Sequence, residues 1–403
     1  MTQPETPVPA PAGSEPDASG GPDVRVKLFA RTDVGQVREH NEDNFLVADL
    51  TRRSRGLLEA NRATGIGNQG AVFAVCDGMG GAAAGEIASQ LAVDIIYERL
   101  VDALGERPLK RDDLARRLVR AVEAAGLRIF HEAKADRSRR GMGTTVTAAA
   151  LVDDVLFFAQ VGDSRGYILR GDTLVQLTRD QSLVNQLIEA GQLTEEEAET
   201  FEHNNIILQA LGTSDTVQVD LTFAELRRGD ILLLCSDGLS GMVRYEEIRE
   251  LLKSSGEPLD ICKALTERAN LAGGHDNITV IVVQFDGQAL KPLETAPEAE
   301  PLKYRKYILG DETMGDTAPL PAPNVGGAGG PGAGDAKAPD GSMRPGAMTA
   351  GASSGWHEQG PHGPHEHDDR IDIPGTHVPI WMVIGIVVGV IVLLAGTAFL
   401  LLR

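Results

Sequence analysis

The sequence predicts an α+β fold, an α/β/β/α sandwich in which two antiparallel sheets lie between outer helices, with a single transmembrane helix at the C-terminal end. Three observations lead to this prediction. Apolar, strand-like runs are separated by turns of two to four residues, which are too short for parallel crossovers. Helical periodicity occurs in two separate pairs of segments. Residues 378–402 contain no charged side chain and exceed the length of about 20 residues that crosses a bilayer.

Nine stretches that are rich in apolar and β-branched residues are predicted as strands. They span 26–32, 44–50, 71–77, 144–152, 155–163, 165–170, 173–178, 230–237 and 278–285. The turns within the middle of this series are 153–154, 162–165 and 171–172. Because a parallel crossover needs a dozen or more residues, we predict that this middle section is an antiparallel meander.

Four segments have apolar residues at helical spacings of three and four. Residues 86–104 and 109–134 lie between strands, whereas residues 245–254 and 259–272 precede the last strand. Residues 181–216 interrupt the strands with short helical pieces and acidic side chains. We predict that this segment is a mobile flap beside the site that the sheets build, although an inert surface excursion has the same pattern.

The composition divides the chain into four parts. Residues 1–22 are rich in Pro, Gly, Ser and acid and are predicted to be a disordered arm. Residues 23–286 form the packed domain, and residues 287–377 form a disordered linker that is rich in histidine near its end. No secretory signal opens the sequence. We therefore expect a single-pass protein of the cell membrane whose large domain stays in the cytoplasm, held by residues 378–402.

The charge and the cysteines exclude several classes of protein. A net charge of −20 disfavours general binding to nucleic acids. The three cysteines, Cys76, Cys235 and Cys262, have no CxxC spacing, which disfavours a disulfide framework and a zinc site. Small buried side chains are the simplest interpretation of Cys76 and Cys235.

Acidic residues stand beside glycine or another small residue at the ends of three predicted strands. Asp77 follows a strand in "AVFAVCDGMGG", Asp237 does so in "ILLLCSDGLSG", and Asp276 precedes one in "AGGHDNITVIVV". Three such carboxylates can converge on one pocket. Oxygen ligands favour hard cations such as Mg²⁺ or Mn²⁺, and Gly78, which has no Cβ, can turn its carbonyl onto an ion.

A fourth acidic group occurs in "VREHNEDNF", where Arg38 precedes Glu42 and Asp43. The planar guanidinium of arginine matches the oxygens of a phosphate group. Acids that bind metal ions, together with an arginine for phosphate, predict phosphoryl chemistry.

Seven motifs of this sequence resemble those of the metal-dependent type 2C (PPM) family of protein Ser/Thr phosphatases, in its bacterial branch. They cover about Val24 to Phe285 and are, in order, "VREHNEDNF", "CDGMGG", "GMGTTVTAA", "VGDSRGYILR", "LTRDQSLV", "LLCSDGL" and "GGHDNITVIVV". The resemblance implies the PPM-type sandwich. It also implies that phosphorylated proteins are the substrates and that a Ser/Thr protein kinase on the same membrane is the natural counterpart.

The resemblance implies a role for each candidate residue. Asp77 would bridge two metal ions, and Gly78 would supply its carbonyl. Asp237 and Asp276 would complete the shell of one ion. The remaining ligands would be Glu42 and Asp43, which serve the other ion largely through water, and Asp163 of "VGDSRG", which holds a third, weaker ion.

The implied mechanism needs no covalent phospho-enzyme. A water activated by two cations attacks phosphorus in line, while Arg38 grips the substrate phosphate. Some family members have a histidine after the Asp-Gly pair that protonates the leaving alkoxide, but this chain has Met79, which cannot donate a proton. His40 and His275 are alternatives, but a lone histidine near a turn is more often a solvated side chain, and the general acid stays unassigned.

Two other functions fit parts of the sequence. A catalytically silent family member would serve as a phosphoprotein-binding scaffold, but the acid set is complete. Residues 78–83 ("GMGGAA") also fit a loose nucleotide-binding fingerprint of an oxidoreductase, but the acidic residue expected about 20 positions later is missing.

Three further segments have both a functional and a simpler interpretation. Basic residues 137–141 ("RSRRG") would attract acidic phosphopeptides or would form a solvated helix end. The His-rich tract would bind metal or would be low-complexity linker. Thr313 and Thr317 lie in an acidic segment that would serve as a phosphorylated docking site.

Overall fold

The computed structural model describes residues 24–56, 63–198, 201, 205–254, 256–293 and 301–310. The predicted N-terminal arm, the linker from residue 311 onward, Thr313, Thr317, the His-rich tract and the predicted membrane span at 378–402 lie outside the described residues. None of the helices in the described ranges is both long enough and apolar enough to cross a bilayer.

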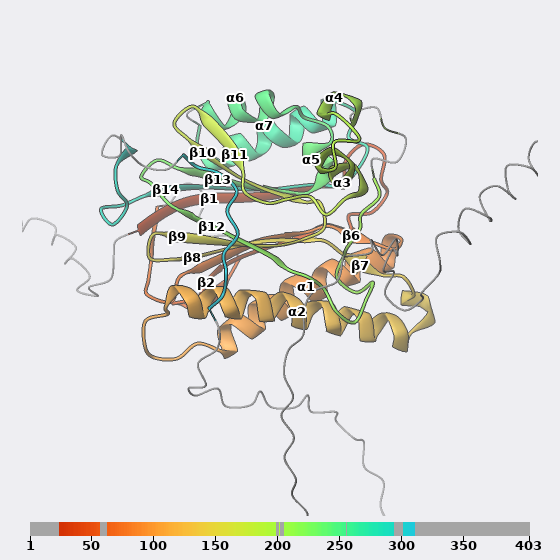
Figure 1. Ribbon diagram of the computed structural model, residues 1–403, viewed down its shortest axis with the longest axis horizontal. Coiled ribbons are helices and arrows are strands. Elements are labelled where there is room, and N and C mark those ends of the chain that lie inside the picture. The colour runs from red at the N-terminus through yellow and green to blue at the C-terminus, as the bar shows by residue number, and fades with distance from the viewer. Residues whose placement is uncertain are drawn as a thin grey trace, which may run out of the picture. The chain divides into compact units, whose positions relative to one another are not determined.

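Two six-stranded antiparallel sheets occupy the middle of the domain (Figure 1). Sheet A has the order β11 (Thr173–Gln176), β10 (Arg165–Arg170), β13 (Ile231–Cys235), β14 (Ile278–Asp286), β1 (Val24–Asp33) and β4 (Thr64–Ile66). Sheet B has the order β12 (Asp220–Glu225), β9 (Val155–Val161), β8 (Val146–Val152), β5 (Ala71–Cys76), β2 (Asn44–Asp49) and β3 (Ser54–Arg55). A small third sheet pairs β6 (Gly78–Met79) with β7 (Gly143–Thr144).

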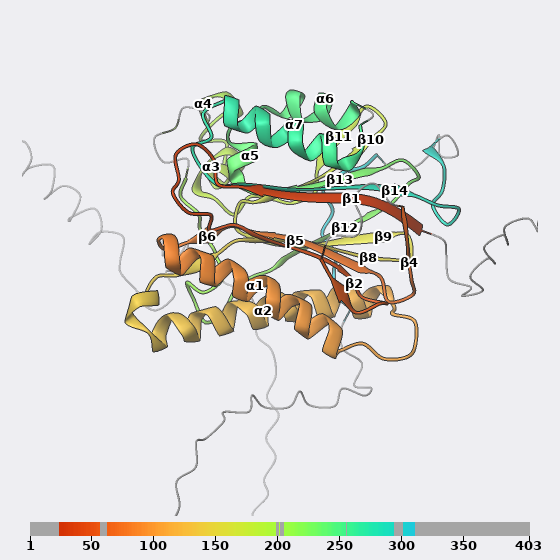
Figure 2. The ribbon, with the colours of Figure 1, turned by 180° about the vertical axis from the view of Figure 1, so that it is seen from behind.

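Helices cover the outer face of each sheet, as Figures 1 and 2 show. Helices α1 (Ala82–Asp102) and α2 (Arg111–Ala135) pack on sheet B, and α6 (Tyr245–Lys253) and α7 (Pro258–Leu271) pack on sheet A. Shorter helical segments are η1 (Arg137–Arg139), α3 (Leu183–Glu189), α4 (Glu195–Ala198) and α5 (Asp237–Ser240). The predicted four-layer sandwich and its four long helices are therefore confirmed.

Three hydrophobic cores separate the four layers. Strand β9 shows how one strand serves two of them: Phe157 packs toward α1 and α2, whereas Phe158 packs between the sheets. Successive side chains of a strand point to opposite faces, so a strand covered on both sides needs an apolar residue at every position. This explains why the central strands appear in the sequence as continuous apolar runs.

The predicted meander is wrong at one turn. Turns 153–154 and 171–172 join neighbouring antiparallel strands, but residues 162–164 carry the chain from β9 in sheet B to β10 in sheet A. Gly162 makes this possible, because its φ of +100° suits glycine and a Cβ there would lie 2.7 Å from Thr145 Cγ2. Strand β10 pairs with β13, which comes much later in the sequence.

The structure also differs from the predicted linker in two ranges. Residues 287–293 and 301–310 belong to the described part of the chain, and residues 301–310, the strap, pack on edge strand β12. Lys306 forms an antiparallel bridge with Thr222, and the Tyr307 N–H donates to Leu221 O at 2.8 Å. In Figure 1 the strap, coloured blue, runs past the sheets toward α2.

Candidate active site

The strand registers bring the predicted acidic residues to one end of the sandwich. Pairing of Asn44 with Cys76 sets the residues before β2 beside the residue after β5. In sheet A, Cys235 pairs with both Arg165 and Val280. The chain segments that carry Asp43 and Asp77 are thus adjacent in sheet B, and those that carry Asp163, Asp237 and Asp276 are adjacent in sheet A.

The backbone of Asp77 is fixed by hydrogen bonds from two threonines. Its N–H donates to Thr145 Oγ1 at 3.0 Å, and its carbonyl accepts from the Thr145 N–H at 2.9 Å and from Thr144 Oγ1 at 2.8 Å. Asp237 lies close enough to Asp77 to raise the pKa of the Asp77 carboxyl. Acids that follow strands of different sheets are therefore near each other.

Glu42 and Gly78 are packed together by a glycine in helix α1. A Cβ on Gly78 would lie 2.5 Å from the carbonyl oxygen of Glu42, and a Cβ on Gly85 would lie 1.9 Å from Glu42 Oε2. Glycine within a helix lowers stability by roughly 0.5–1 kcal/mol relative to alanine, so the glycine at position 85 requires a structural explanation. The space that Gly85 leaves is filled by the Glu42 carboxylate.

Asp43 is buried and held by one hydroxyl. Ser236 Oγ donates to Asp43 Oδ2 at 2.8 Å, and Ser236 immediately precedes Asp237. Asn277 contributes from the opposite side, since its Oδ1 accepts from the Glu42 N–H at 2.8 Å. These contacts tie the start of β2 to the segments that carry Asp237 and Asp276.

Arg38 lies in the loop after β1 and pairs with a predicted metal ligand. Its Nη2 is 2.7 Å from Asp276 Oδ2, and half of the Arg38 side chain is exposed. The loop packs closely, because a Cβ on Gly35 would lie 2.3 Å from the Asp276 carbonyl oxygen. Arg38 is thus at the rim of the cluster, with one face turned to solvent.

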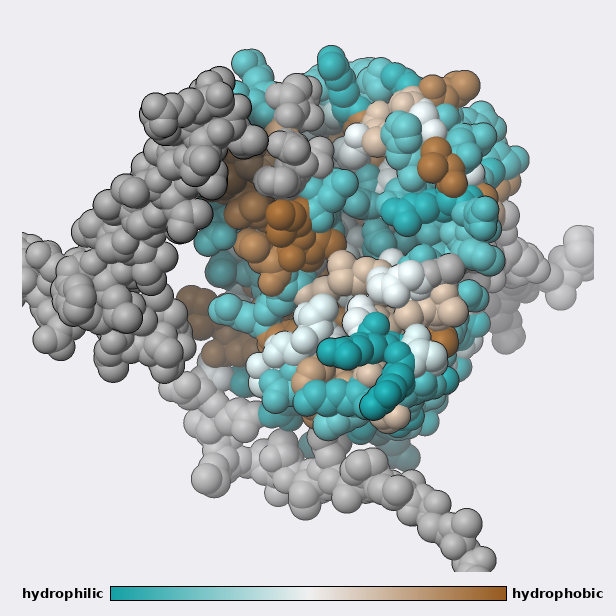
Figure 3. All heavy atoms as spheres, turned by 90° about the vertical axis from the view of Figure 1, so that its right-hand side faces the viewer, coloured by the Kyte–Doolittle hydropathy of each residue, from teal (hydrophilic) through white to brown (hydrophobic). Residues whose placement is uncertain are grey.

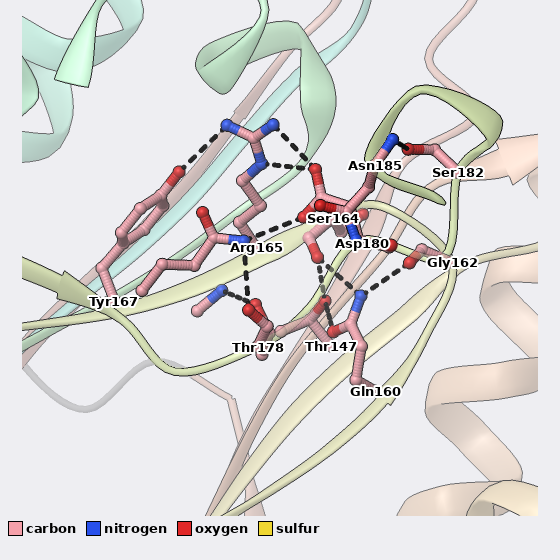
Figure 4. A network of polar contacts seen from close by, with 12 residues as sticks. Thr147, Gln160, Gly162, Ser164, Arg165, Tyr167, Thr178, Asp180, Ser182 and Asn185 are labelled. Carbon is pink, nitrogen blue, oxygen red and sulfur yellow. Dashed lines mark hydrogen bonds and ion pairs between the residues drawn. The ribbon is translucent and has the colours of Figure 1, made fainter. Parts of the chain in front are cut away.

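The residues on either side of Asp163 are connected to the start of the flap segment by polar contacts, and Figure 4 shows Gly162, Ser164, Arg165 and Asp180 in this network. The Gly162 N–H donates to Gln181 Oε1 at 2.9 Å, and the Gln181 N–H donates to the Gly162 carbonyl at 2.8 Å. The Arg165 guanidinium bonds the Asp180 carboxylate at 2.7 Å. The predicted flap, residues 181–216, therefore starts beside Asp163, and its mobility stays a prediction.

The cluster has unsatisfied buried oxygens and raised pKa values. Within the described ranges, Asp43 Oδ1, Asp163 Oδ1 and Asp237 Oδ1 are buried without a hydrogen-bond partner. Burial raises the pKa of Asp43 and of Asp163 to about 7, and neighbouring carboxylates add to this. Burial also raises the pKa of Asp77 well above its usual range, with further contributions from Asp43 and Asp237. Crowded carboxylates of this kind are stabilised by cations.

The donor set fits divalent cations. All candidate ligands are carboxylate or carbonyl oxygens, which Mg²⁺ and Mn²⁺ prefer. In the described part of the chain, no three His, Cys, Asp or Glu side chains lie close enough together to hold a metal ion as they stand. Binding of ions would therefore have to draw the carboxylates further together.

The structure does not assign the general acid to either of the histidines considered for it or to a residue at the position of Met79. Met79 packs beside β7, since its Sδ would be 3.3 Å from a Cβ on Gly143. His40 and His275 are exposed, and His40 is close enough to Glu42 to act on its charge.

The sequence did not indicate the residues that support the acids. Thr145, Ser236 and Gly85 contact Asp77, Asp43 and Glu42 across long sequence distances. The one available signal was Gly85, because a glycine inside a predicted helix suggests a close approach by another group.

Comparison with known proteins agrees with the fold and with phosphatase function. The family model described as protein phosphatase 2C matches residues 58–272. The chain is 37% identical over 254 residues to the serine/threonine phosphatase stp of Listeria innocua, covering 63% of this chain and 94% of the relative. It is 38% identical over 261 residues to the protein phosphatase PhpP of Streptococcus pneumoniae, covering 65% and 98%.

A solved structure gives the same result. The catalytic domain of the serine/threonine protein phosphatase PstP, in complex with two manganese ions, matches with 36% identity and a TM-score of 0.53. The match covers 65% of this chain and 99% of that one. The chain therefore belongs to the protein phosphatase 2C (PPM) family, in its bacterial branch. It is a protein serine/threonine phosphatase.

Proposed function

We propose that the acidic cluster holds two Mn²⁺ or Mg²⁺ ions, with a third held more weakly, for the hydrolysis of phosphoserine and phosphothreonine. The observation that carries this proposal is the set of buried, unpartnered oxygens on Asp43, Asp163 and Asp237. Buried polar atoms are normally satisfied, so three orphans in one cluster call for a ligand that accepts their lone pairs.

We assign the ligands as follows. Asp77 and the Gly78 carbonyl would hold the two principal ions. Asp237 and Asp276 would be further ligands of one ion. The other ligands would be Glu42 and Asp43, which would act largely through water, and Asp163, which would hold the third ion.

Bound ions would supply an activated water and positive charge for the phosphoryl oxygens. Arg38, at the solvent-exposed rim, orients the substrate phosphate through its planar guanidinium. Asp276, which pairs with Arg38, keeps the guanidinium turned toward the cluster. The hydrogen bonds between Thr145 and the backbone of Asp77 fix the position of Asp77, so that little reorganisation accompanies the reaction.

Substitution of the acids tests this assignment. Asp77→Asn, Asp237→Asn and Asp276→Asn should each lower phosphate release from a phosphothreonine peptide with Mn²⁺ by at least about 100-fold. Asp286→Asn is the matched control, because Asp286 ends the same strand that Asp276 precedes and is exposed. Unchanged turnover in a folded, metal-saturated Asp77→Asn protein would refute the assignment.

We also propose that residues 378–402 anchor the enzyme in the cell membrane with the catalytic domain in the cytoplasm. The charge-free composition of this segment supports the proposal. Its counterpart there would be a membrane Ser/Thr kinase, since tethering both enzymes raises their encounter concentration. Removing residues 378–403 should move the protein from the membrane fraction to the soluble fraction of cells, whereas an unchanged distribution contradicts the anchor.

A further inference from the structure

The turn formed by residues 136–141, the arginine turn, lies against the loop that follows Asp77. A Cβ on Gly80 would lie 2.6 Å from the carbonyl oxygen of Gly141. Directly beside this contact, Met79 of β6 pairs with Gly143 of β7. The arginine turn is therefore built onto the rim of the active site, although it comes from the end of helix α2.

Hydrogen bonds give the arginine turn a defined shape. Asp136 Oδ1 accepts from the Ser138 N–H at 2.9 Å and from Ser138 Oγ at 2.7 Å. Arg139 folds back onto helix α2, where its Nη1 lies 2.9 Å from Glu132 Oε2. Gly141 has a φ of +81°, which turns the chain into β7. A binding site on this turn would lose little entropy on ordering.

Arg137 and Arg140 project from this turn without a partner. Both side chains are exposed, and neither has an ion pair or side-chain hydrogen bond within the described part of the chain. Residues 131–141 carry four basic and two acidic side chains, whereas the whole chain has 38 basic and 58 acidic ones. Figure 3 views the right-hand side of Figure 1 and shows strongly hydrophilic side chains on the lower half of that face, on the side of α1 and α2.

An extended peptide substrate is long enough to reach from Asp77 to the arginine turn. Asp77 and Gly80 are three residues apart, so their Cα atoms are separated by at most about 11 Å. An extended peptide rises about 3.3 Å per residue. Arg140, next to Gly141, is therefore within reach of a peptide side chain a few positions from the phosphorylated residue.

We propose that Arg137 and Arg140 form a docking site for an anionic side chain of the substrate, a few residues from the phosphothreonine that is hydrolysed. The ligand is an aspartate, a glutamate or a second phosphorylated residue, since arginine binds carboxylate and phosphate oxygens through the same planar fork. This inference rests on the proposed function and adds the class of substrate. The flap helix α4, of sequence EEEA, lies on the upper side of the same end of the molecule (Figure 1).

Phosphopeptide kinetics with the full chain and Mn²⁺ test the docking site. Three phosphothreonine peptides are compared: one with neutral flanks, one with aspartates three and four positions away on both sides, and one with second phosphothreonines there. The wild-type protein should prefer both anionic peptides in kcat/KM by about tenfold over the neutral one. In the Arg137→Gln/Arg140→Gln double variant this ratio should fall to about one. Preference for the diphosphorylated peptide alone assigns the site to phosphate.

The control is Lys263→Gln, because Lys263 is an exposed basic residue on helix α7 in the opposite helix layer. The preference of this variant for the anionic peptides in kcat/KM should equal that of the wild-type protein. The proposal is overturned if the wild-type protein does not prefer the anionic peptides in kcat/KM. It is also overturned if the double variant loses kcat/KM by the same factor on all three peptides.

A binding measurement separates failure of this site from failure of the proposed hydrolysis. Fluorescence anisotropy of the labelled peptides is measured on Asp77→Asn protein with and without the two arginine substitutions. Tighter binding of the anionic peptides that the double substitution abolishes supports the docking site even if no peptide is hydrolysed. Equal binding of anionic and neutral peptides overturns it.

Discussion

At the scale of single residues, the hydroxyl of Thr145 links the two halves of the acidic cluster. It accepts the Asp77 N–H at 3.0 Å and bonds Ser164 Oγ at 2.8 Å, and Ser164 directly follows Asp163. Thr145 is almost fully buried, so no water replaces its hydroxyl when it is removed. We infer that it positions Asp77 and Asp163 relative to each other.

Thr145→Val keeps the shape of the side chain and removes the hydroxyl. It should lower Mn²⁺ affinity and kcat by about 10- to 100-fold, as is typical for residues that orient metal ligands. Calorimetric Mn²⁺ titration and phosphopeptide kinetics measure both quantities. Thr145→Ser retains the hydroxyl and should restore most of the loss, whereas equal defects in both variants would show that only packing matters.

The acidic residues of the cluster were predictable from the sequence, but their supports were not. Asp77, Asp237 and Asp276 each stand at the end of an apolar run beside glycine or asparagine, which is a local signal. Thr145 lies in "GTTVTAAA", where it reads as an ordinary β-branched strand residue. Its hydrogen bond to Asp77 spans 68 positions and leaves no local trace.

At the scale of elements, the strap of residues 301–310 closes the exposed edge of sheet B. Backbone bonds join it to β12, and the Tyr307 ring packs edge-on against Phe157 at 4.9 Å and Phe223 at 5.3 Å. The Tyr304 hydroxyl donates to Asp220 at 2.6 Å, and Lys306 pairs with the same carboxylate. An edge strand with unpaired backbone groups invites aggregation, and the strap removes this liability.

Tyr307→Ala should destabilise the domain by about 2–3 kcal/mol, because it removes two aromatic contacts and a partly buried ring. Chemical denaturation measures this change. Ile308→Ala is the matched control, since Ile308 is 87% exposed and its truncation should cost less than about 0.5 kcal/mol. Equal effects of the two substitutions would mean that the strap is not part of the folded unit.

The strap was missed because composition dominated the prediction. The segment is short and is separated from the domain by "KPLETAPEAE", which resembles the Pro-rich linker that follows. The strap pairs with β12, a strand that was also missed because its sequence, "DLTFAE", is short and half polar. Neither partner has a strong pattern of its own, so the pairing appears only in three dimensions.

At the scale of the whole molecule, folding gathers like charges at one end of the sandwich. Burial raises the pKa of Asp43 and Asp163 from 3.8 to about 7. The folded state therefore binds more protons than the unfolded chain between about pH 4 and pH 7, and the stability from these groups is lost as the pH rises through this window.

Metal ions should offset this loss. With a chelator present, the Tm should decrease as the pH is raised from 5 to 7.5, and saturating Mn²⁺ should raise the Tm more at pH 7.5 than at pH 5. Calorimetry at the two pH values measures the difference. Asp237→Asn should reduce the Mn²⁺-dependent increase, whereas an increase independent of pH would contradict the role of the buried carboxylates.

The layers were predictable at this scale because strand length, helix periodicity and short turns restrict the architecture strongly. The assignment of strands to sheets was not, because the turn at 162–164 is as short as a hairpin turn yet crosses between sheets. Because of this crossing, Asp163 lies in the connection between β9 of sheet B and β10 of sheet A, near Asp237.

If the acidic cluster holds divalent ions, anomalous X-ray diffraction from crystals grown with Mn²⁺ will locate them. We predict two strong manganese peaks that share Asp77 as a ligand, with Asp237 and Asp276 on one of them and Gly78 O beside one of them. Manganese peaks that lie elsewhere, or none within coordination distance of Asp77 at saturating Mn²⁺, would contradict it.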